Sequence, residues 1–279
     1  MNELSANFKR FVISITIPRV NCLGMISFIP FACGFSFLQS VQGEVLNLVV
    51  PPNYADQSVP DFIRQDNFHP DNPITNLGAL LGRVLFYDRR LSSSEQVSCG
   101  SCHQQEHAFS DPDDFSEGVN GTTQRRSMRL INVRFSNEHQ MFWDKRARNV
   151  ETQATMPIRD HLEMGFSGQD GQPPFEDLLS KLRSIEEYRI LFSTAFGDSS
   201  ISESRIQFAL AQFLRSIQSF DSVYDKGRTM VTSEIEDFPN FTEAENRGKR
   251  LFNLSPIEGG TGCASCHRPP EFGIESGSQ

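Results

Sequence analysis

A short motif, Cys-x-x-Cys-His, occurs twice in this chain and constrains it more than any other feature. Its two copies consist of Cys99, Cys102 and His103, and of Cys263, Cys266 and His267. On one helical turn these three positions share a face, so two thiols and an imidazole can meet one flat macrocycle. This spacing is the attachment signal for c-type haem. A zinc site or free thiols would be the alternative, but the repeated motif predicts two covalently bound c-type haems.

The N-terminal residues are predicted to direct export, because c-type haem is attached outside the bacterial cytoplasm. Three basic residues, the last being Arg19, precede or adjoin an apolar run from Val20 to Leu38, and small residues near Gly43 permit cleavage. We therefore expect a signal peptide over residues 1–43 and a periplasmic protein. An uncleaved membrane anchor is the alternative, since the run approaches spanning length.

The charge of the chain argues against nucleic acid as a partner. Its 26 Lys and Arg against 35 Asp and Glu give a formal net charge of -9. Removing residues 1–43 takes away three basic residues and one acidic residue, so the secreted body carries -11. Such a surface attracts a small basic electron carrier and repels a polyanion. The alternative, that the negative charge serves only to keep the protein soluble, agrees equally well with the composition.

A second repeat accompanies the haem motif. GRVLF, from Gly82 to Phe86, matches GKRLF, from Gly248 to Phe252, and each segment lies shortly before its Cys-x-x-Cys-His copy. Thr75 is predicted to cap the first of these helices, and Thr242 with Glu245 forms a predicted capping box for the second. This arrangement indicates an internal duplication of a cytochrome c-like unit.

Helical periodicity dominates the remaining body, and strand signals are sparse. After Pro173 and Pro174 a helix is predicted from Phe175 to Ile185, and Ser200 with Glu203 is expected to form the capping box of another. The apolar stripe of this second helix is Ile206, Leu210, Phe213, Leu214, Ile217 and Phe220. We predict a mainly α fold with two cytochrome c-like haem domains in tandem, residues 44–172 and 173–279.

Nine segments between about residue 70 and His267 occur in the order and at the spacings typical of one family. They are NPIT, LGRVLFYDRRLSSS, VSCGSCH, HAFSD, FWDKRA, ETQATMP, LEMG, SFDSVYDKG and CASCH. In these segments the chain resembles the bacterial di-haem cytochrome c peroxidases and their MauG-like relatives.

The resemblance implies a division of labour between the haems. In this family the N-terminal haem binds and cleaves peroxide, and the C-terminal haem receives electrons from a donor protein. His103 would then be the proximal ligand of the peroxide-reducing haem, and His267 that of the electron-transfer haem. The implied partners are hydrogen peroxide and a small cytochrome c or cupredoxin, and a homodimer is compatible with the family.

The resemblance also assigns individual side chains. Trp143 matches the family's tryptophan between the haems, where an indole shortens electron transfer, although a single Trp is more often part of a core. Gln153 and Glu163 match the distal-pocket pair, with Glu163 expected to transfer protons and Gln153 to position peroxide. Asn132 matches the residue that helps to hold a structural calcium ion.

Two features depart from the family pattern. The loop of residues 116–126, SEGVNGTTQRR, contains no His that could ligate the first haem at rest. We therefore expect a five-coordinate first haem that needs no reductive activation, as in MauG-like members. The sixth ligand of the family's second haem, Met or Tyr, follows far downstream of its motif, whereas this sequence stops at Gln279, twelve residues after His267. We expect a second domain that is incomplete through C-terminal truncation.

The leading hypothesis is a cytochrome c peroxidase that reduces hydrogen peroxide to water. One alternative is a MauG-like di-haem enzyme that oxidatively modifies a partner protein. The other is a non-catalytic di-haem electron carrier, against which the pair Gln153 and Glu163 argues.

Overall fold

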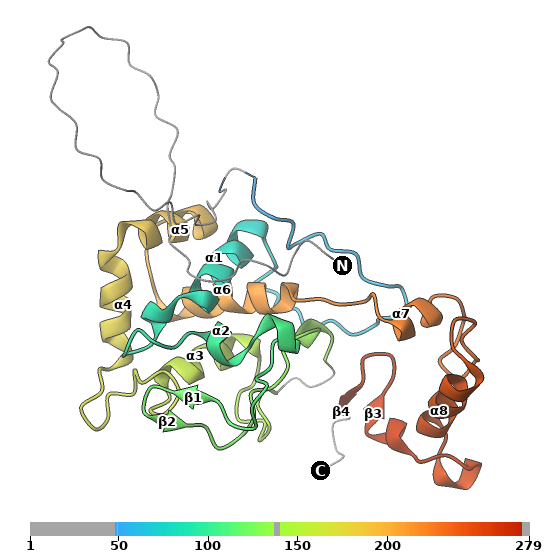
Figure 1. The fold of residues 1–279 in the computed structure, drawn as a ribbon. Helices are drawn as coiled ribbons and strands as arrows, with labels where there is room; N and C mark the ends of the chain where they lie inside the picture. Colours follow the sequence, from blue (N-terminus) through green and yellow to red (C-terminus); the bar gives the residue numbers. More distant parts are fainter. Residues whose placement is uncertain (1–47, 49, 137–139, 275–279) are drawn as a thin grey trace, which may run out of the picture. The chain divides into compact units, whose positions relative to one another are not determined.

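The structure is a computed structural model that describes residues 48, 50–136 and 140–274. The expected signal peptide, residues 1–43, lies outside the described residues. The described part is mainly helical, as predicted (Figure 1). Its α-helices in chain order are α1 (Asn76–Tyr87), α2 (Cys99–Cys102), α3 (Val150–Arg159), α4 (Phe175–Ser184), α5 (Glu186–Phe196), α6 (Glu203–Ser216), α7 (Val223–Arg228) and α8 (Glu243–Asn253).

The strands are short and form two antiparallel ribbons. β1 (Glu117–Gly118) pairs with β2 (Gly121–Thr122), with Glu117 opposite Thr122. β3 (His267–Arg268) pairs with β4 (Gly273–Ile274), with His267 opposite Ile274. The first ribbon follows one copy of the haem motif and the second begins at the last residue of the other copy, so strands serve here to close loops and not to build a core.

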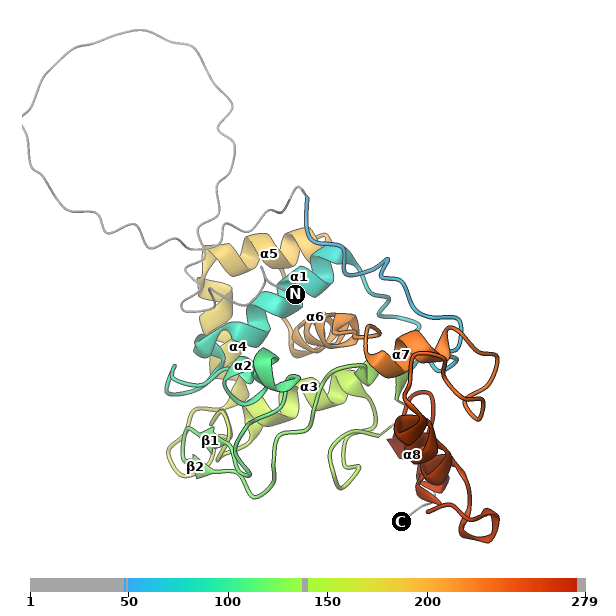
Figure 2. The same cartoon turned by 45° about the vertical axis from the view of Figure 1, so that its right-hand side comes forward.

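α1 forms where the sequence predicted it. The Thr75 hydroxyl accepts a hydrogen bond of 3.0 Å from the backbone N–H of Gly78, which satisfies a free donor of the first turn. The stripe of Leu80, Leu81, Val84 and Leu85 is at most 3% exposed. This face packs against α6, and Figures 1 and 2 show the two helices side by side from both directions.

Gly82 permits the closest approach between these helices. A Cβ atom at Gly82 would lie 1.9 Å from the carbonyl oxygen of Ala209 and 2.8 Å from the Cβ of Phe213, both in α6. The matching Gly248 of the second repeat, in α8, has no such neighbour within 4 Å. The same local sequence thus lies in a packed site in one copy and in an open site in the other.

This contrast yields a matched pair of substitutions. Gly82→Ala should lower the free energy of unfolding by about 2 kcal/mol or more, because the backbone of α6 must move to admit the methyl group. Gly248→Ala should raise it by up to about 1 kcal/mol, since alanine favours the helix and meets nothing. Urea unfolding of both variants measures the difference. Equal effects would contradict the close crossing.

The predicted start of α6 is wrong by two residues. Ser202 caps this helix, its hydroxyl accepting a hydrogen bond of 3.3 Å from a backbone N–H three residues on. Ser200 instead bonds the carboxylate of Asp198, both through its N–H and through its hydroxyl. The Glu203 carboxylate binds Arg159 of α3 and so does not complete a capping box. Only Ser200 has a Glu three residues on, whereas Arg205 follows Ser202, so the pattern favoured the wrong serine; in the structure the Glu203 carboxylate forms a tertiary ion pair instead.

Other expected boundaries agree with the structure. The helix predicted from Phe175 corresponds to α4, and the Thr242–Glu245 capping box begins α8, with the Thr242 N–H 2.7 Å from the Glu245 carboxylate. However, α6, which the predicted division assigns to the second domain, packs against α1 and α3 of the first. The division at residues 172 and 173 does not follow a break in packing, and it stays a prediction.

A chain of buried polar groups ties α3 and α6 to the segment before α1. Gln212 of α6 donates to the Asn72 side chain at 2.8 Å, and Asn72 donates to the Glu151 carboxylate of α3 at 2.9 Å. Arg215 of α6 binds both oxygens of Glu151, at 2.5 and 3.0 Å, and donates to Asn67 at 3.2 Å. Arg215 is 2% exposed and Glu151 4%, so this ion pair is shielded from water.

The buried pair predicts an unequal response to single and double substitution. Arg215→Met should cost about 3 kcal/mol or more of unfolding free energy, because it leaves the Glu151 carboxylate buried without a countercharge. Adding Glu151→Leu should recover much of that loss, since no charge then stays buried. Urea titrations of the two variants and the parent test this. A double variant less stable than Arg215→Met would show that the pair is not the dominant interaction.

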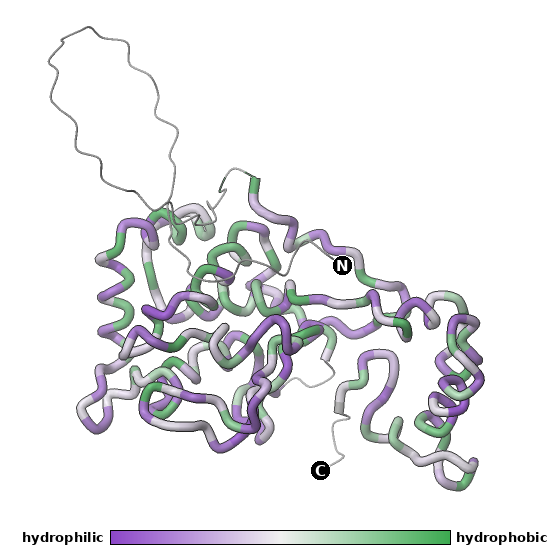
Figure 3. The backbone as a smooth tube through the Cα atoms, in the orientation of Figure 1, coloured by the Kyte–Doolittle hydropathy of each residue, from purple (hydrophilic) through white to green (hydrophobic). Residues whose placement is uncertain are grey.

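The hydropathy of the residues in each helix agrees with how deeply that helix is packed. Figure 3 shows predominantly apolar residues along α1, whereas hydrophilic and hydrophobic residues alternate along α8. Among the described residues, no helix combines the length and the apolar character that crossing a membrane requires.

Candidate active site

The first haem motif forms α2 and the turn that follows it. Ser98 and Ser101 form a reciprocal capping box, with the Ser98 N–H 3.0 Å from the Ser101 hydroxyl. His103 ends the helix, its N–H donating to the Cys99 carbonyl at 2.9 Å. Cys99 and Cys102 are partly buried and form no disulfide. The fold thus brings the three predicted haem-binding side chains into one turn.

The imidazole of His103 is oriented by the backbone. Its Nδ1 lies 2.9 Å from the carbonyl oxygen of Phe109. A carbonyl can only accept, so Nδ1 carries the proton and Nε2 presents a lone pair, the arrangement of an iron-ligating histidine. Burial lowers the pKa of His103, which favours this neutral form. Ala108 and Phe109 have left-handed φ angles of 59° and 56°, the unusual backbone that brings this carbonyl to the ring.

The second motif is more open. Cys263 is exposed, Cys266 is partly buried, and the Cys263 sulfur lies 3.2 Å from the Thr261 hydroxyl. His267 is exposed and begins β3. Within residues 140–274 no hydrogen bond orients its ring in the way that Phe109 orients His103. The spacing of the predicted ligands is the same, but their surroundings differ.

Glu163 lies in a tightly bonded loop between α3 and α4. The Asp160 carboxylate accepts hydrogen bonds from the backbone N–H groups of Leu162, at 2.9 Å, and Glu163, at 3.1 Å. The Val119 N–H of the β1–β2 hairpin donates to the Glu163 carbonyl at 3.0 Å. A Cβ at Gly118 would lie 2.0 Å from the Leu162 carbonyl oxygen, so only glycine permits this contact. The hairpin and the loop therefore hold the backbone of Glu163 from two sides.

The environment of Glu163 suits proton transfer near neutral pH. Burial raises the pKa of its carboxyl from 4.5 to about 7; the nearby Asp160 adds to the rise and Arg146 opposes it. Burial raises the pKa of the Cys99 thiol to about 12, with smaller contributions from Cys102 and from Glu163. Burial raises the pKa of Cys102 as well, and the charges of Asp111 and Glu163 add to the rise. Glu163 thus lies close enough to the first haem motif for its charge to act on both thiols.

Gln153 and Trp143 lie on separate elements. Gln153 is partly buried in α3, close to the N-terminus of that helix. Trp143 is 51% exposed in a loop that Met141 and Ala147 close through mutual backbone hydrogen bonds. Its indole N–H donates to the Arg126 carbonyl at 3.0 Å. Among the described residues, no hydrogen bond joins Gln153, Trp143 and Glu163 to one another.

Asn132 connects its own segment to the backbone that follows α6 through hydrogen bonds. Its side chain exchanges two hydrogen bonds of 2.9 Å with the backbone of Ser219, and its N–H donates to the Ile217 carbonyl at 2.9 Å. No group of three or more His, Cys, Asp or Glu side chains within the described residues could hold a metal ion. The calcium site at Asn132 stays a prediction.

The sequence reasoning missed two residues that hold the loop of Glu163 and one whose charge lowers its pKa. They are Gly118, Asp160 and Arg146. Asp160 had a visible signal, because an Asp two or three residues before a loop residue commonly caps its backbone N–H. Gly118 and Arg146 had none, since they approach Glu163 from segments distant in the sequence.

The raised pKa of Glu163 makes stability depend on pH. The folded state holds this proton more tightly than the unfolded chain, so the stabilisation is full below about pH 4.5 and is lost as pH rises through about 7. Gln cannot ionise. The melting temperature of Glu163→Gln, relative to the parent, should therefore rise between about pH 5 and pH 8. A difference that is constant over this range would show that Glu163 ionises without cost.

The comparisons with known proteins agree on one family. The family model described as di-haem cytochrome c peroxidase matches residues 77–230. Methylamine utilization protein MauG of Methylophilus methylotrophus is 34% identical over 208 residues, 74% of this chain and 56% of that protein. Cytochrome c551 peroxidase of Nitrosomonas europaea is 30% identical over 200 residues, 71% of this chain and 53% of that protein.

A solved structure agrees with these relatives. It is a MauG-like protein associated with microbial copper homeostasis, 31% identical with a TM-score of 0.63, and the match covers 76% of this chain and 57% of that one. The chain spans about half the length of the curated relatives it matches. The family-model match contains the first haem motif, Trp143, Gln153 and Glu163, and it ends before the second motif.

Proposed function

Since the family model matches more than half of its residues, this chain belongs to the di-haem cytochrome c peroxidase family, and we propose that it reduces hydrogen peroxide to water. The proposed electron donor is a small cytochrome c or a cupredoxin. One arrangement carries the proposal: hydrogen bonds to Asp160 and Val119 hold the backbone of Glu163, burial raises the pKa of its carboxyl to about 7, and its charge acts on the thiols of the first haem motif. A group with this pKa can accept and return a proton at neutral pH.

The residues of the first motif fit a c-type haem. Cys99 and Cys102 offer free thiols one helical turn apart, and His103 offers the Nε2 lone pair. The Phe86 ring, with its centroid 6.4 Å from that of His103, adds an apolar contact beside the imidazole. When bound, the haem supplies the iron at which peroxide is bound and reduced. Cys263, Cys266 and His267 would hold the second haem.

The proposed acid and base is Glu163. Its carboxylate takes the first proton from hydrogen peroxide, and the resulting carboxylic acid delivers that proton to the departing oxygen as the O–O bond breaks. With two electrons and two further protons from solvent, both oxygens leave as water. The Gln153 amide is proposed to orient peroxide by hydrogen bonding. Desolvation of Glu163 keeps its proton affinity near the value that both steps require.

Trp143 is the proposed electron relay toward the first motif. Its indole donates to the carbonyl of Arg126, and the Arg126 guanidinium donates to the Asp111 carbonyl at 2.8 and 3.1 Å. Asp111 lies two residues after Phe109, whose carbonyl orients His103. A continuous set of hydrogen bonds and short backbone steps thus links the exposed indole to the proximal imidazole.

We also propose that the first haem needs no reductive activation. The loop that lacks a ligating His folds as the β1–β2 hairpin, and its backbone is bonded to the Glu163 loop at Val119 and Asn120. A segment held in this way is poorly suited to swing between ligating and open positions. The absence of His from residues 116–126 also favours a second candidate function, MauG-like oxidative modification of a partner protein.

Three further features belong to the proposal. Export to the periplasm is supported by the haem motifs and by the apolar run before Gly43. A calcium ion at Asn132 would need to compete with the Ser219 N–H for the same amide oxygen. A homodimer is compatible with the family.

The decisive experiment measures peroxide consumption by the haem-loaded protein with reduced cytochrome c. The parent should oxidise cytochrome c catalytically, and Glu163→Gln should lose at least about tenfold in turnover with both haems still attached. Glu176→Gln, an exposed change on α4, is the matched control and should keep full turnover. Single-turnover oxidation of cytochrome c would favour the modifying enzyme. Two six-coordinate haems inert to peroxide would identify an electron carrier.

A further inference from the structure

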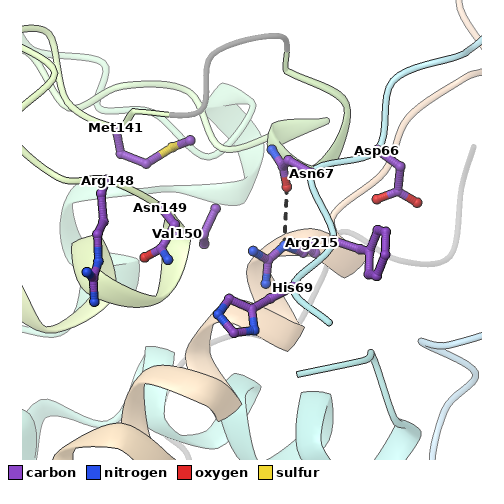
Figure 4. Close-up of a pocket in the computed structure, with 9 residues that line it drawn as sticks. Asp66, Asn67, His69, Met141, Arg148, Asn149, Val150 and Arg215 are labelled. Carbon is purple, nitrogen blue, oxygen red and sulfur yellow. Dashed lines mark hydrogen bonds between the residues drawn. The ribbon is translucent and has the colours of Figure 1, made fainter. Parts of the chain in front are cut away.

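A hollow of about 260 Å³ lies outside the proposed active site (Figure 4). Its walls come from the segment before α1, from the loop that leads into α3, and from α6. His69, Arg148, Asn149 and Arg215 line it, and neither Glu163 nor any haem-binding cysteine does. The hollow therefore needs an explanation of its own.

The side chains around the hollow offer donors. Arg125 and Arg146 pair with Asp144, whereas no ion pair joins Arg148 to an acidic residue within the described part of the chain. The Nδ1 of His69 accepts a hydrogen bond of 3.2 Å from the Asp71 N–H, so in the neutral ring Nε2 carries a proton to donate. A guanidinium and an imidazole N–H thus border the same space.

The nearby acceptors are already used. Asn149 accepts from the Thr152 N–H at 2.9 Å, which leaves its NH₂ group to donate. The Asp66 carboxylate, also on the wall, is bound by the Arg134 guanidinium through both oxygens, at 2.6 to 3.1 Å. The hollow is therefore rich in donors and carries positive charge.

The Arg215 guanidinium also borders the hollow, but its N–H donors are largely engaged. Three of its N–H groups bind Glu151 and Asn67, and Figure 4 shows its bond to Asn67 at the edge of the hollow. The pair with Glu151 is neutral as a whole. Among the described residues, the positive charge at the site without an ion-pair partner is thus that of Arg148, supplemented by the positive end of α3, which begins at Val150.

From this arrangement we propose that the hollow binds a small oxyanion, a phosphate or carboxylate group, held by Arg148, His69 and Asn149. Guanidinium and N–H donors that border one hollow, where the side-chain acceptors are already engaged, favour such a ligand over a cation or a neutral molecule. The oxyanion has two possible sources: a free anion such as inorganic phosphate, or the carboxylate of a haem propionate. This inference goes beyond the proposed reaction, because it adds a ligand that peroxide reduction does not require.

Binding would have a structural consequence. His69 belongs to the segment before α1, and Arg148 and Asn149 lie between the Trp143 loop and α3. One anion would connect these segments through charge-assisted hydrogen bonds, which are stronger than bonds between neutral groups. The Trp143 loop would then be braced from its C-terminal side.

The test is a calorimetric titration of the haem-loaded protein with inorganic phosphate at constant ionic strength. We expect one site, with an affinity that falls at least about tenfold in Arg148→Gln. Arg247→Gln, which removes one exposed positive charge from α8, should bind phosphate like the parent. An equal loss of phosphate affinity in both variants would show that only the net charge of the protein matters, and this would overturn the proposed site.

A second measurement distinguishes the sources. If a propionate occupies the hollow, the parent will not bind phosphate, and Arg148→Gln will shift the propionate bands in the resonance Raman spectrum of the haem while Arg247→Gln will not. That outcome supports the site and assigns its ligand. No phosphate binding together with unchanged propionate bands in Arg148→Gln overturns the proposal.

Discussion

The buried ion pair between Glu151 and Arg215 is the constraint on which the arrangement of the site depends. Neither charge tolerates burial alone, so α3 and α6 must meet at one register, and Asn72 and Gln212 complete the hydrogen bonds of the pair. Gln153 lies on α3 two residues after Glu151, and the loop with Glu163 begins where α3 ends. An ion pair that has no proposed part in the reaction thus helps to determine where Gln153 and the Glu163 loop lie.

Short irregular segments then complete what the helices position. The carbonyl that orients His103 depends on left-handed backbone at Ala108 and Phe109, and the Glu163 loop depends on a glycine that touches the Leu162 carbonyl. Such conformations are unfavourable on their own and persist because the neighbouring structure holds them. Rigidity of this kind suits a site in which a proton must move a short distance between fixed atoms.

Local signals predicted the local structure well and the tertiary contacts poorly. Thr75 and the stripe that follows it predicted α1, because a cap and a helical period are both read from neighbouring residues. Ser200 failed as a cap because Glu203 is engaged by Arg159, a partner 44 residues away. The β1–β2 hairpin has strands of two residues, too short for any period, and the pKa of Glu163 depends on burial that no sequence pattern encodes.

The two repeats show how much packing adds to the same local sequence. GRVLF and GKRLF both form helices ahead of a haem motif, yet Gly82 lies against the α6 backbone and Gly248 has no neighbour within 4 Å. His103 is held by a carbonyl in a partly buried turn, whereas His267 is exposed on a short ribbon. Haem attachment requires only the motif, which both copies have. Proton-coupled chemistry also requires an oriented imidazole and a desolvated carboxyl group, and in the described residues only the first copy adjoins both. The proposal that peroxide is reduced at the first motif therefore has a physical basis in packing, independent of the order of the motifs along the chain.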